Sequence, residues 1–350
     1  DAEAALGYYS LDVYLAGRRD PIGNVTFNVA EYRKPEFQVK VEASPTDVLS
    51  GESFTATVQA DYYSGGGVAD AAVAWTLIAE TYTFQPPDEY ASYSFSDREQ
   101  DVWGYYEGEG PRTEKIAEGQ GRTDASGRFT ATLPVDLSAA AEARNLTFEA
   151  TVTDLAQTTV SGRTNVVAHL SQVYPGIRPA TYVGKQGEVQ TFEMVLLDWD
   201  GNPLPNRSLS LEIVERRWYS VQEQDPSGRI TWKTSVEEIP VESFDSLTTD
   251  ENGKTEATFI PPRGGIYRGR VTALDDQGNP GRASAFMWVA GEEYIPWQQT
   301  NDRGFELITD KKSYQPGETA QVLIASPFQG ETYALVTVER GRIRFQDVVL

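Results

Sequence analysis

The chain of 350 residues contains no cysteine and one histidine, and these two absences exclude several kinds of site. Without cysteine there can be no disulfide, no thiolate metal ligand and no thiol nucleophile. His169 has no second histidine or cysteine with which to complete a metal site. A Ser-His-Asp triad is not expected either, because no Gly-x-Ser-x-Gly motif precedes a helix. We therefore interpret His169 as a surface or linker residue, and we expect no catalytic, cofactor-binding or metal-binding residue.

Positive charge and long apolar runs are also scarce. The 30 basic residues are outnumbered by 52 acidic residues, which gives a formal net charge of −22. Such a surface repels nucleic acid and anionic lipid, so we expect neither as a partner. No apolar run approaches the ~20 residues of a membrane-spanning helix.

The two ends of the sequence do not resemble the ends of a whole protein. The first residues lack the pattern of a signal peptide. Asp1 to Tyr14 reads as a strand already in progress, and Leu350 stops within an apolar run. We interpret the sequence as an internal portion of a longer protein, in which any membrane anchor would lie outside these residues.

Helical periodicity is nearly absent, whereas the alternation of apolar and polar residues typical of strands is widespread. Residues 54–60 and 209–213 are clear examples, and threonine fills many of the polar positions. This pattern is typical of antiparallel strands with one buried face. We therefore predict an all-β protein.

A Gly-Glu pair followed by such alternation occurs three times, at Gly51-Glu52, Gly187-Glu188 and Gly317-Glu318. The copies are about 130 residues apart, a period that indicates whole domains in tandem and not the short units of a solenoid. Within the two complete units, a turn with aspartate and glycine precedes a strand at residues 123–128 and 249–254. Closing hairpins are predicted at residues 146–167 and 265–289.

Residues 7–30 match this closing hairpin alone, and residues 305–340 match only the opening strands. We therefore predict four segments. They are the end of a preceding domain at residues 1–34, complete domains at residues 35–168 and 169–292, and the first strands of a further domain at residues 303–350. Short strands separated by turns predict tandem antiparallel β-sandwiches of the immunoglobulin or fibronectin type III kind.

Two segments depart from this repeat. Residues 84–116 are polar, rich in glycine and tyrosine, and only weakly alternating. We interpret them as a variable exposed loop, with a partner-binding or protease-sensitive loop as the alternative. The aromatic cluster Trp103, Tyr105 and Tyr106 within it is the one candidate for glycan binding. Residues 216–246 occupy the same place in the second unit and predict a long hairpin around residues 225–228.

Acidic pairs and clusters are interpreted as turns. Asp198 to Pro203 is similar to the start of a calcium loop, but Pro203 stands where glycine is required and Leu209 where a bidentate glutamate is required. We therefore predict a tight turn at this place, and another at Asp275-Asp276.

Some sequence strings resemble a known family. Residues 30–39, Ala-Glu-Tyr-Arg-Lys-Pro-Glu-Phe-Gln-Val, are similar to the segment that leads from one macroglobulin-like domain into the next in bacterial alpha-2-macroglobulins. Residues 307–320, with Tyr-Gln-Pro-Gly-Glu at 314–318, and Val338-Glu339-Arg340 resemble the opening of the bait-region domain of these proteins. The resemblance implies that the domains are macroglobulin-like and that the chain is a middle portion of such a protein.

This resemblance implies a scaffold role in a broad-range endopeptidase inhibitor and no enzymatic activity. In this family a protease cuts an exposed bait segment, and the inhibitor rearranges to entrap it. Many members also bind the protease through a Cys-Gly-Glu-Gln thioester, which this cysteine-free sequence does not contain.

The resemblance further implies proteases as partners through the parent protein and a peptidoglycan synthase as a second partner. It implies a periplasmic or extracellular parent protein with a lipid anchor. The alternative is a tandem immunoglobulin-like stalk or adhesin of a bacterial surface protein.

Overall fold

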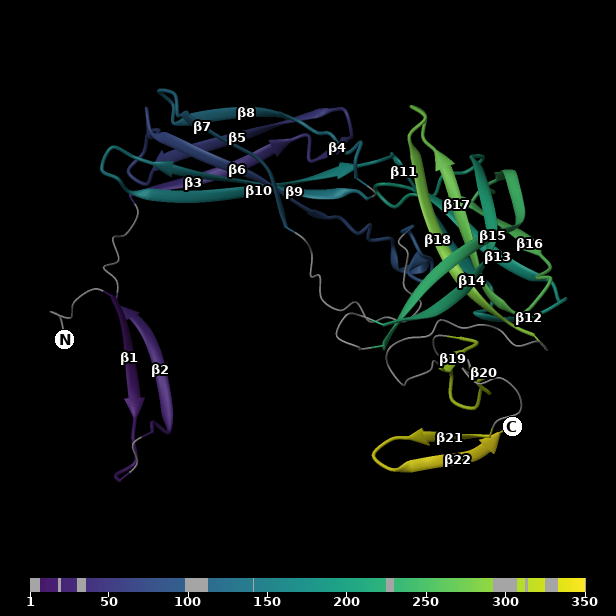
Figure 1. Ribbon diagram of the computed structural model, residues 1–350. Helices are drawn as coiled ribbons and strands as arrows, with labels where there is room; N and C mark the ends of the chain where they lie inside the picture. The colour runs from purple at the N-terminus through teal and green to yellow at the C-terminus, as the bar shows by residue number, and fades with distance from the viewer. Residues whose placement is uncertain are drawn as a thin grey trace.

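The computed structural model describes residues 7–17, 20–29, 36–97, 113–140, 142–224, 230–291, 307–311, 314–324 and 333–349. Within these residues the chain folds into β-sheets, and the single helical element is a 3₁₀ turn, η1 (Asp88–Tyr90) (Figure 1). None of the helical structure in this part of the chain is long and apolar enough to cross a membrane. The predicted all-β fold class is confirmed.

The first sandwich consists of β3 (Phe37–Ser44), β4 (Asp47–Leu49), β5 (Ser53–Tyr62), β6 (Ala72–Thr81), β7 (Glu114–Arg122), β8 (Arg128–Pro134), β9 (Arg144–Thr153) and β10 (Thr159–His169). One sheet has the order β3-β5-β8 and the other β4-β10-β9-β6-β7. All neighbours pair antiparallel except β4 and β10, which are parallel.

The second sandwich repeats this topology. Its strands are β11 (Val173–Pro179), β12 (Val183–Lys185), β13 (Gln190–Asp198), β14 (Ser208–Gln224), β15 (Ile230–Thr248), β16 (Lys254–Phe259), β17 (Gly265–Leu274) and β18 (Pro280–Ala290). The sheets have the orders β11-β13-β16 and β12-β18-β17-β14-β15, so each strand corresponds to the one eight labels earlier. The repeated sequence pattern therefore reflects a repeated fold.

Each sandwich has its own core between its two sheets. In the first, the inward positions of β5 are buried while Thr55 and Thr57 on the outward positions are partly exposed, as alternation predicts. Phe54 and Phe148 are among the fully buried side chains of this core, and Phe192 and Tyr267 among those of the second. Burial of one such side chain contributes about 1.5–3 kcal/mol.

The predicted hairpins are present. β9 pairs with β10, and β17 with β18, along their whole lengths. β14 and β15 form the long hairpin expected within residues 216–246, with Ser208 opposite Thr248 at its base and Gln224 opposite Ile230 at its far end. The turn expected at residues 225–228 lies outside the described residues.

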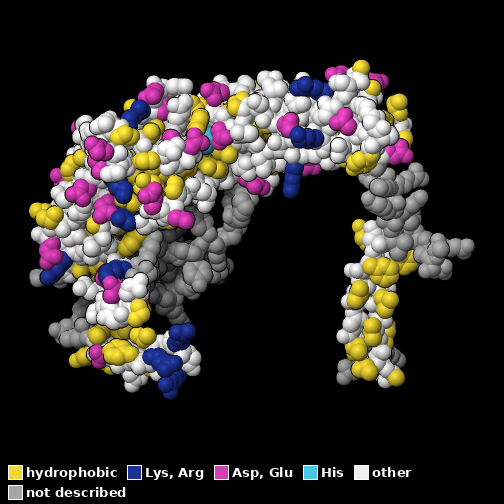
Figure 2. Space-filling model, turned by 180° about the vertical axis from the view of Figure 1, so that it is seen from behind, with side chains coloured by type: hydrophobic (Ala, Val, Ile, Leu, Met, Phe, Trp, Pro, Cys, Tyr) yellow, Lys and Arg dark blue, Asp and Glu magenta, His cyan; other side chains and the backbone are white. Residues whose placement is uncertain are grey.

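Shorter hairpins lie before and after the sandwiches. They are β1 (Gly7–Val13) with β2 (Gly23–Val29), β19 (Leu307–Thr309) with β20 (Val322–Ile324), and β21 (Ala334–Glu339) with β22 (Ile343–Val349). Figure 2 shows apolar side chains along the β1–β2 hairpin, where Leu11, Val25 and Phe27 are exposed. The hairpin predicted at residues 7–30 is confirmed.

An Asp-x-x-Gly turn recurs between strands. In each copy one carboxylate oxygen accepts hydrogen bonds from the N–H groups two and four residues later. The glycine three residues after the aspartate has a φ between 71° and 86°, which other residues adopt at a cost. The copies begin at Asp124, Asp198, Asp250 and Asp275. Asp198 therefore starts the predicted tight turn.

The Asp275 turn also fixes the connection between the sandwiches. The second carboxylate oxygen of Asp275 accepts the N–H of Gln172 at 3.1 Å and the side-chain amide of Asn279 at 3.0 Å. The Ser171 hydroxyl donates to the backbone oxygen of Asn279 at 3.0 Å. Burial by itself raises the pKa of Asp275, but the hydrogen bonds from Gln172 and Asn279 outweigh burial and leave this pKa lowered. The ionised carboxylate is thus part of the fold.

We expect Asp275→Ala to lower the free energy of unfolding of the second sandwich by about 1–3 kcal/mol, because several N–H donors lose their acceptor. Asp276→Ala is the matched control, since its carboxylate makes an exposed ion pair with Arg207 at 2.8 Å. The control should cost less than about 1 kcal/mol. Denaturant unfolding of both variants measures the difference, and equal effects would contradict this account of the turn.

Candidate functional site

The two sandwiches are joined by a short linker and by a second, longer connection. β10 ends at His169 and β11 begins at Val173, so three residues separate the sandwiches along the chain. The second connection is the segment Tyr82–Asp97, called the strap here, which leaves β6 of the first sandwich and reaches the second sandwich, where η1 lies (Figure 1). The strap and the linker together form the junction.

The strap pairs with the backbone of the second sandwich. Ser94 donates its N–H to the backbone oxygen of Ile177 at 2.8 Å and accepts the N–H of Ile177 at 3.0 Å. Ser96 accepts the N–H of Ser284 at 3.0 Å. Ile177 lies on the edge strand β11, and Ser284 lies on the part of β18 that β12 does not pair with, so the strap bonds to a free strand edge in each sheet. Because unpaired edges attract other strands, this pairing also protects the second sandwich.

Aromatic side chains of the strap cover the outer face of the three-stranded sheet. The Phe84 ring stacks on Tyr174 of β11 with a centroid distance of 4.2 Å and an interplanar angle of 10°. Phe84 and Tyr90 are buried, and they pack with the outward side chains of β13, Val195 and Leu197, which are 0% exposed. The second sandwich therefore has an apolar outer face that the first sandwich covers.

The corresponding face of the first sandwich is polar. β5 holds the same central position in its sheet as β13, but its outward residues include Thr55 and Thr57. β13 instead carries four consecutive apolar residues, Met194 to Leu197, all fully buried. A continuous apolar run indicates a strand covered on both faces. This run is the sequence signal that could have revealed the docking.

Cationic side chains hold the middle of the strap. The Arg178 guanidinium lies 4.5 Å from the centroid of the Tyr93 ring and donates a hydrogen bond to the Ser92 hydroxyl. The Lys254 ammonium lies 5.5 Å from the centroid of the Tyr90 ring. Such cation–π contacts contribute about 0.5–2 kcal/mol, more when water is excluded.

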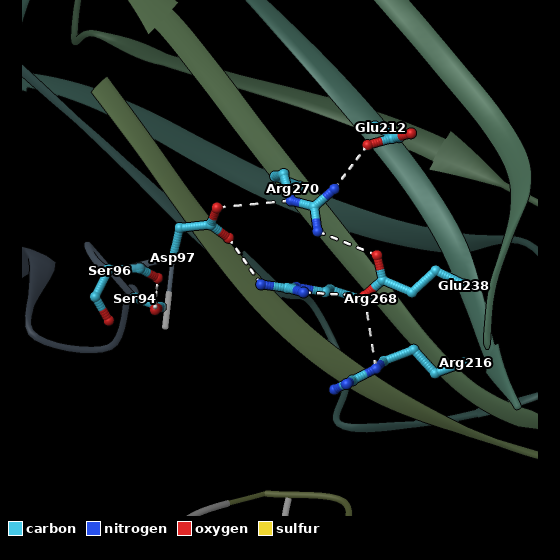
Figure 3. Close-up of polar contacts among 8 residues, drawn as sticks. All are labelled: Ser94, Ser96, Asp97, Glu212, Arg216, Glu238, Arg268 and Arg270. Carbon is cyan, nitrogen blue, oxygen red and sulfur yellow. Dashed lines mark hydrogen bonds and ion pairs between the residues drawn. The ribbon is translucent and has the colours of Figure 1, made fainter. Parts of the chain in front are cut away.

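Asp97 clamps the end of the strap on the five-stranded sheet. Figure 3 shows its carboxylate pointing toward Arg268 and Arg270 of β17. Arg268 donates to Asp97 at 2.9 Å, and Arg270 lies 3.6 Å from its other oxygen. Glu238 of β15 accepts from the same two arginines at 2.9 and 3.2 Å. The strap thus adds a carboxylate to a network of alternating charge.

Two arginines of this network are buried, whereas Asp97, Glu238 and Arg270 are partly exposed. Arg268 is 4% exposed, and Arg216 of β14 lies 3.6 Å from Glu238 on the same face. Burial by itself raises the pKa of Glu238. The hydrogen bonds and positive charges of Arg268 and Arg270 lower it by more, so this pKa stays below its usual value. Because a buried charge without its partner is costly, the clamp requires all its members in place.

The structure places His169 at the junction, as the linker interpretation predicts, but the prediction of a surface residue is wrong. The side chain is 1% exposed. Its Nε2 lies 3.1 Å from a carboxylate oxygen of Asp47, and its Nδ1 lies 2.6 Å from the hydroxyl of Tyr174. The rings of Tyr82 and Trp199 also pack against it. Three of these four residues, Asp47, Tyr82 and Trp199, are far from His169 in the sequence, so no local pattern could reveal its burial.

The interpretation of residues 84–116 as an exposed loop is also wrong for the docked part. Phe84 and Tyr90 are buried and Ser94 is paired, so residues 84–97 pack against the second sandwich. β7 begins at Glu114, which places the last residues of this segment in a strand. The proposed glycan cluster of Trp103, Tyr105 and Tyr106 lies outside the described residues.

A groove of about 1530 Å³ runs beside the strap. Its walls include Tyr82, Tyr174, Trp288 and Arg282. Within the described ranges, no group of three His, Asp or Glu side chains is placed to hold a metal ion. The junction acts through packing, hydrogen bonds and ion pairs, and its arrangement can hold two bodies at a fixed angle.

Comparison with known proteins finds similarity to several alpha-2-macroglobulins. No family model matches the chain. Its sequence is similar to the alpha-2-macroglobulin homologue of Nostoc sp. (22% identity over 96% of the chain and 17% of the relative). It is also similar to that of Deinococcus radiodurans (26% identity over 99% of the chain and 34% of the relative). The chain thus spans about a third of the length of one of these relatives and about a sixth of the other.

Solved structures show a similar fold. Native alpha-2-macroglobulin of E. coli matches with a TM-score of 0.52 and 16% identity, over 100% of the chain and 22% of that protein. E. coli alpha-2-macroglobulin activated by porcine elastase matches with a TM-score of 0.51 and 14% identity, over 88% of the chain and 26% of that protein. At these identities the likeness concerns the fold.

We expect Phe84→Ala to lower the free energy of unfolding by about 3 kcal/mol, because it empties a buried site between strap and sheet. Tyr63→Ala is the control, since Tyr63 is an aromatic residue of the first sandwich that is 65% exposed. Gly176→Ala tests the same contact from the β11 side, where an added Cβ would lie 2.7 Å from the Phe95 ring.

These variants are compared by denaturant unfolding. Phe84→Ala and Gly176→Ala should both loosen the strap, and Tyr63→Ala should not. A Phe84→Ala variant as stable as the parent chain would contradict the docking.

Proposed function

We propose that this chain, which belongs to the bacterial alpha-2-macroglobulin family, supplies a rigid scaffold to a broad-range inhibitor that entraps endopeptidases. The observation that carries the proposal is the strap. It bonds to both sheets of the second sandwich and so joins two domains into one body. An inhibitor that turns a cut at one place into movement elsewhere needs rigid bodies beside the moving part.

The relatives support this proposal. The family consists in general of protease inhibitors and not of enzymes, and one of the solved relatives was activated by porcine elastase. The chain is similar in fold to both the native and the elastase-activated E. coli protein. That likeness supports sandwiches that keep their fold while other parts of the parent protein move.

The place of action and the partners belong to the same proposal. Proteases are the partners through the parent protein, and a peptidoglycan synthase is a second one. The parent protein acts in the periplasm or outside the cell, held by a lipid anchor outside these residues. Cell fractionation of the full-length protein tests this location, and recovery in the cytoplasm would contradict it.

The experiment for the inhibitor uses the full-length protein mixed with several proteases of unrelated specificity, including elastase. We expect one preferred early cut outside residues 36–291, followed by a more compact shape in small-angle X-ray scattering. Physical entrapment leaves the protease active site untouched. Hydrolysis of a small peptide substrate should therefore persist while hydrolysis of a large protein substrate falls at least tenfold.

The control is the full-length protein mixed with proteases whose active sites have been blocked covalently. They should produce no cut and no compaction, because the proposal makes the change depend on cleavage. Scattered cleavage without a change of shape would instead fit a stalk or adhesin and would overturn the inhibitor.

A further inference from the structure

His169 occupies the point where the first sandwich, the linker and the strap meet. It is the last residue of β10, two residues before the Ser171 that the Asp275 turn holds. Asp47 of β4 and Tyr174 of β11 contact its two ring nitrogens. Tyr82, the first residue of the strap, meets the ring edge to face at a centroid distance of 5.7 Å.

The turn after β13 completes the surroundings of this histidine. The Trp199 ring lies 4.8 Å from the imidazole ring, and the carboxylate of Asp200 acts on it through space. The charged and titratable groups that face His169 are therefore Asp47, Asp200, Tyr82 and Tyr174. Two of these are carboxylates and two are phenols.

The contacts fix the protonation of the ring. Burial raises the pKa of Tyr174 far above its usual value, so its hydroxyl keeps its proton. The Asp47 carboxylate can only accept, so in a neutral ring Nδ1 has no hydrogen and the Tyr174 hydroxyl donates to it. Nε2 carries the hydrogen and donates to Asp47 at 3.1 Å. The closed junction thus holds a neutral imidazole with both nitrogens satisfied.

A second proton on the ring is incompatible with this arrangement of hydrogens. An imidazolium carries hydrogen on both nitrogens, so the hydrogen bond to Tyr174 would have to reverse and the hydroxyl would have to turn its own hydrogen away from the ring. The charge would also be buried, where only the Asp47 and Asp200 carboxylates offset the loss of water. The hydrogen bond that must reverse joins β10 of the first sandwich to β11 of the second.

We propose that His169 makes the junction acid-sensitive, so that its protonation favours an open arrangement in which β11, with Tyr174, separates from the strap and from the end of the first sandwich. This goes beyond the scaffold role, since it gives the two-sandwich body a second, more open state. It does not depend on protease trapping.

The lowered pKa of His169 determines how pH changes the stability of the closed junction. Burial lowers the pKa of His169 below its ordinary value of 6.5, against the opposing effect of Asp47 and Asp200. Above this value the ring is neutral in both states and pH has no effect. Below it the open state binds the proton first, so the closed junction loses stability until the pH reaches the lowered pKa.

The histidine content of the chain simplifies the interpretation of that window. His169 is the single histidine in the sequence, and histidine is the side chain whose unperturbed pKa falls between pH 5 and 8. The pKa of Glu238 in the strap clamp is lowered, so this carboxylate stays ionised throughout. A transition between pH 7 and 5 that disappears in His169→Gln therefore reports His169.

The experiment follows amide hydrogen exchange at Ser94 and Ile177, whose N–H groups form the strap pairing. Between pH 7.5 and 5, the exchange rates, corrected for the intrinsic rates of an unfolded peptide, should rise roughly threefold or more, since one pKa unit equals a tenfold change in the equilibrium. The amide of Val152 in the first core serves as the internal reference. In His169→Gln, which cannot become an imidazolium, the rise should be absent.

Proton NMR gives a second measurement on the unmodified chain, where one histidine gives one set of ring signals. We expect these signals to titrate with a midpoint below pH 6.5. In Tyr174→Phe, which removes the hydrogen bond to Nδ1, we expect the midpoint to move to higher pH. Titration of the parent chain at or above 6.5, or the same exchange response in His169→Gln, would overturn the proposal.

Discussion

The packing of the strap on the outer face of β13 is the interaction on which the junction depends. Val195 and Leu197 point away from the core of the second sandwich, and without a cover they would meet water. Phe84 and Tyr90 of the first sandwich provide this cover. An apolar face on one domain and aromatic residues on the other therefore make two separate cores dependent on each other.

Other features of the junction follow from this packing. Once Phe84 stacks on Tyr174, the chain is placed to pair Ser94 with Ile177 and to bring Asp97 to Arg268. Backbone hydrogen bonds and buried ion pairs are sensitive to distance, so they hold an angle more firmly than apolar packing alone. This combination of apolar anchor and polar clamp is what a rigid scaffold requires.

The sandwiches could be predicted from the sequence because the patterns that specify their strands and turns lie within short stretches of residues. Alternation over residues 54–60 sets one strand and its buried face, and the Asp-x-x-Gly turns set where strands begin. The strap could not be predicted this way. Its anchoring side chains lie on irregular backbone without a period, and their partners on β13 lie about 100 residues further along the chain.

His169 also shows what the sequence could and could not predict. Its position at the end of a strand was predictable from the hairpin pattern, whereas its burial was not. Asp47, Tyr82, Tyr174 and Trp199 surround it from four different segments. One regional signal was available, the uninterrupted apolar run from Met194 to Leu197, which indicates that something covers β13 on its outer side.

The most direct test of the central claim is the stability of the second sandwich without the strap. A fragment of residues 171–291 should unfold at lower denaturant concentration than the same sandwich within residues 36–291. A synthetic peptide of residues 82–97 should bind it saturably and raise its midpoint, whereas the peptide with Phe84→Ala should not. A fragment that is as stable as the longer chain and does not bind the peptide would contradict the account.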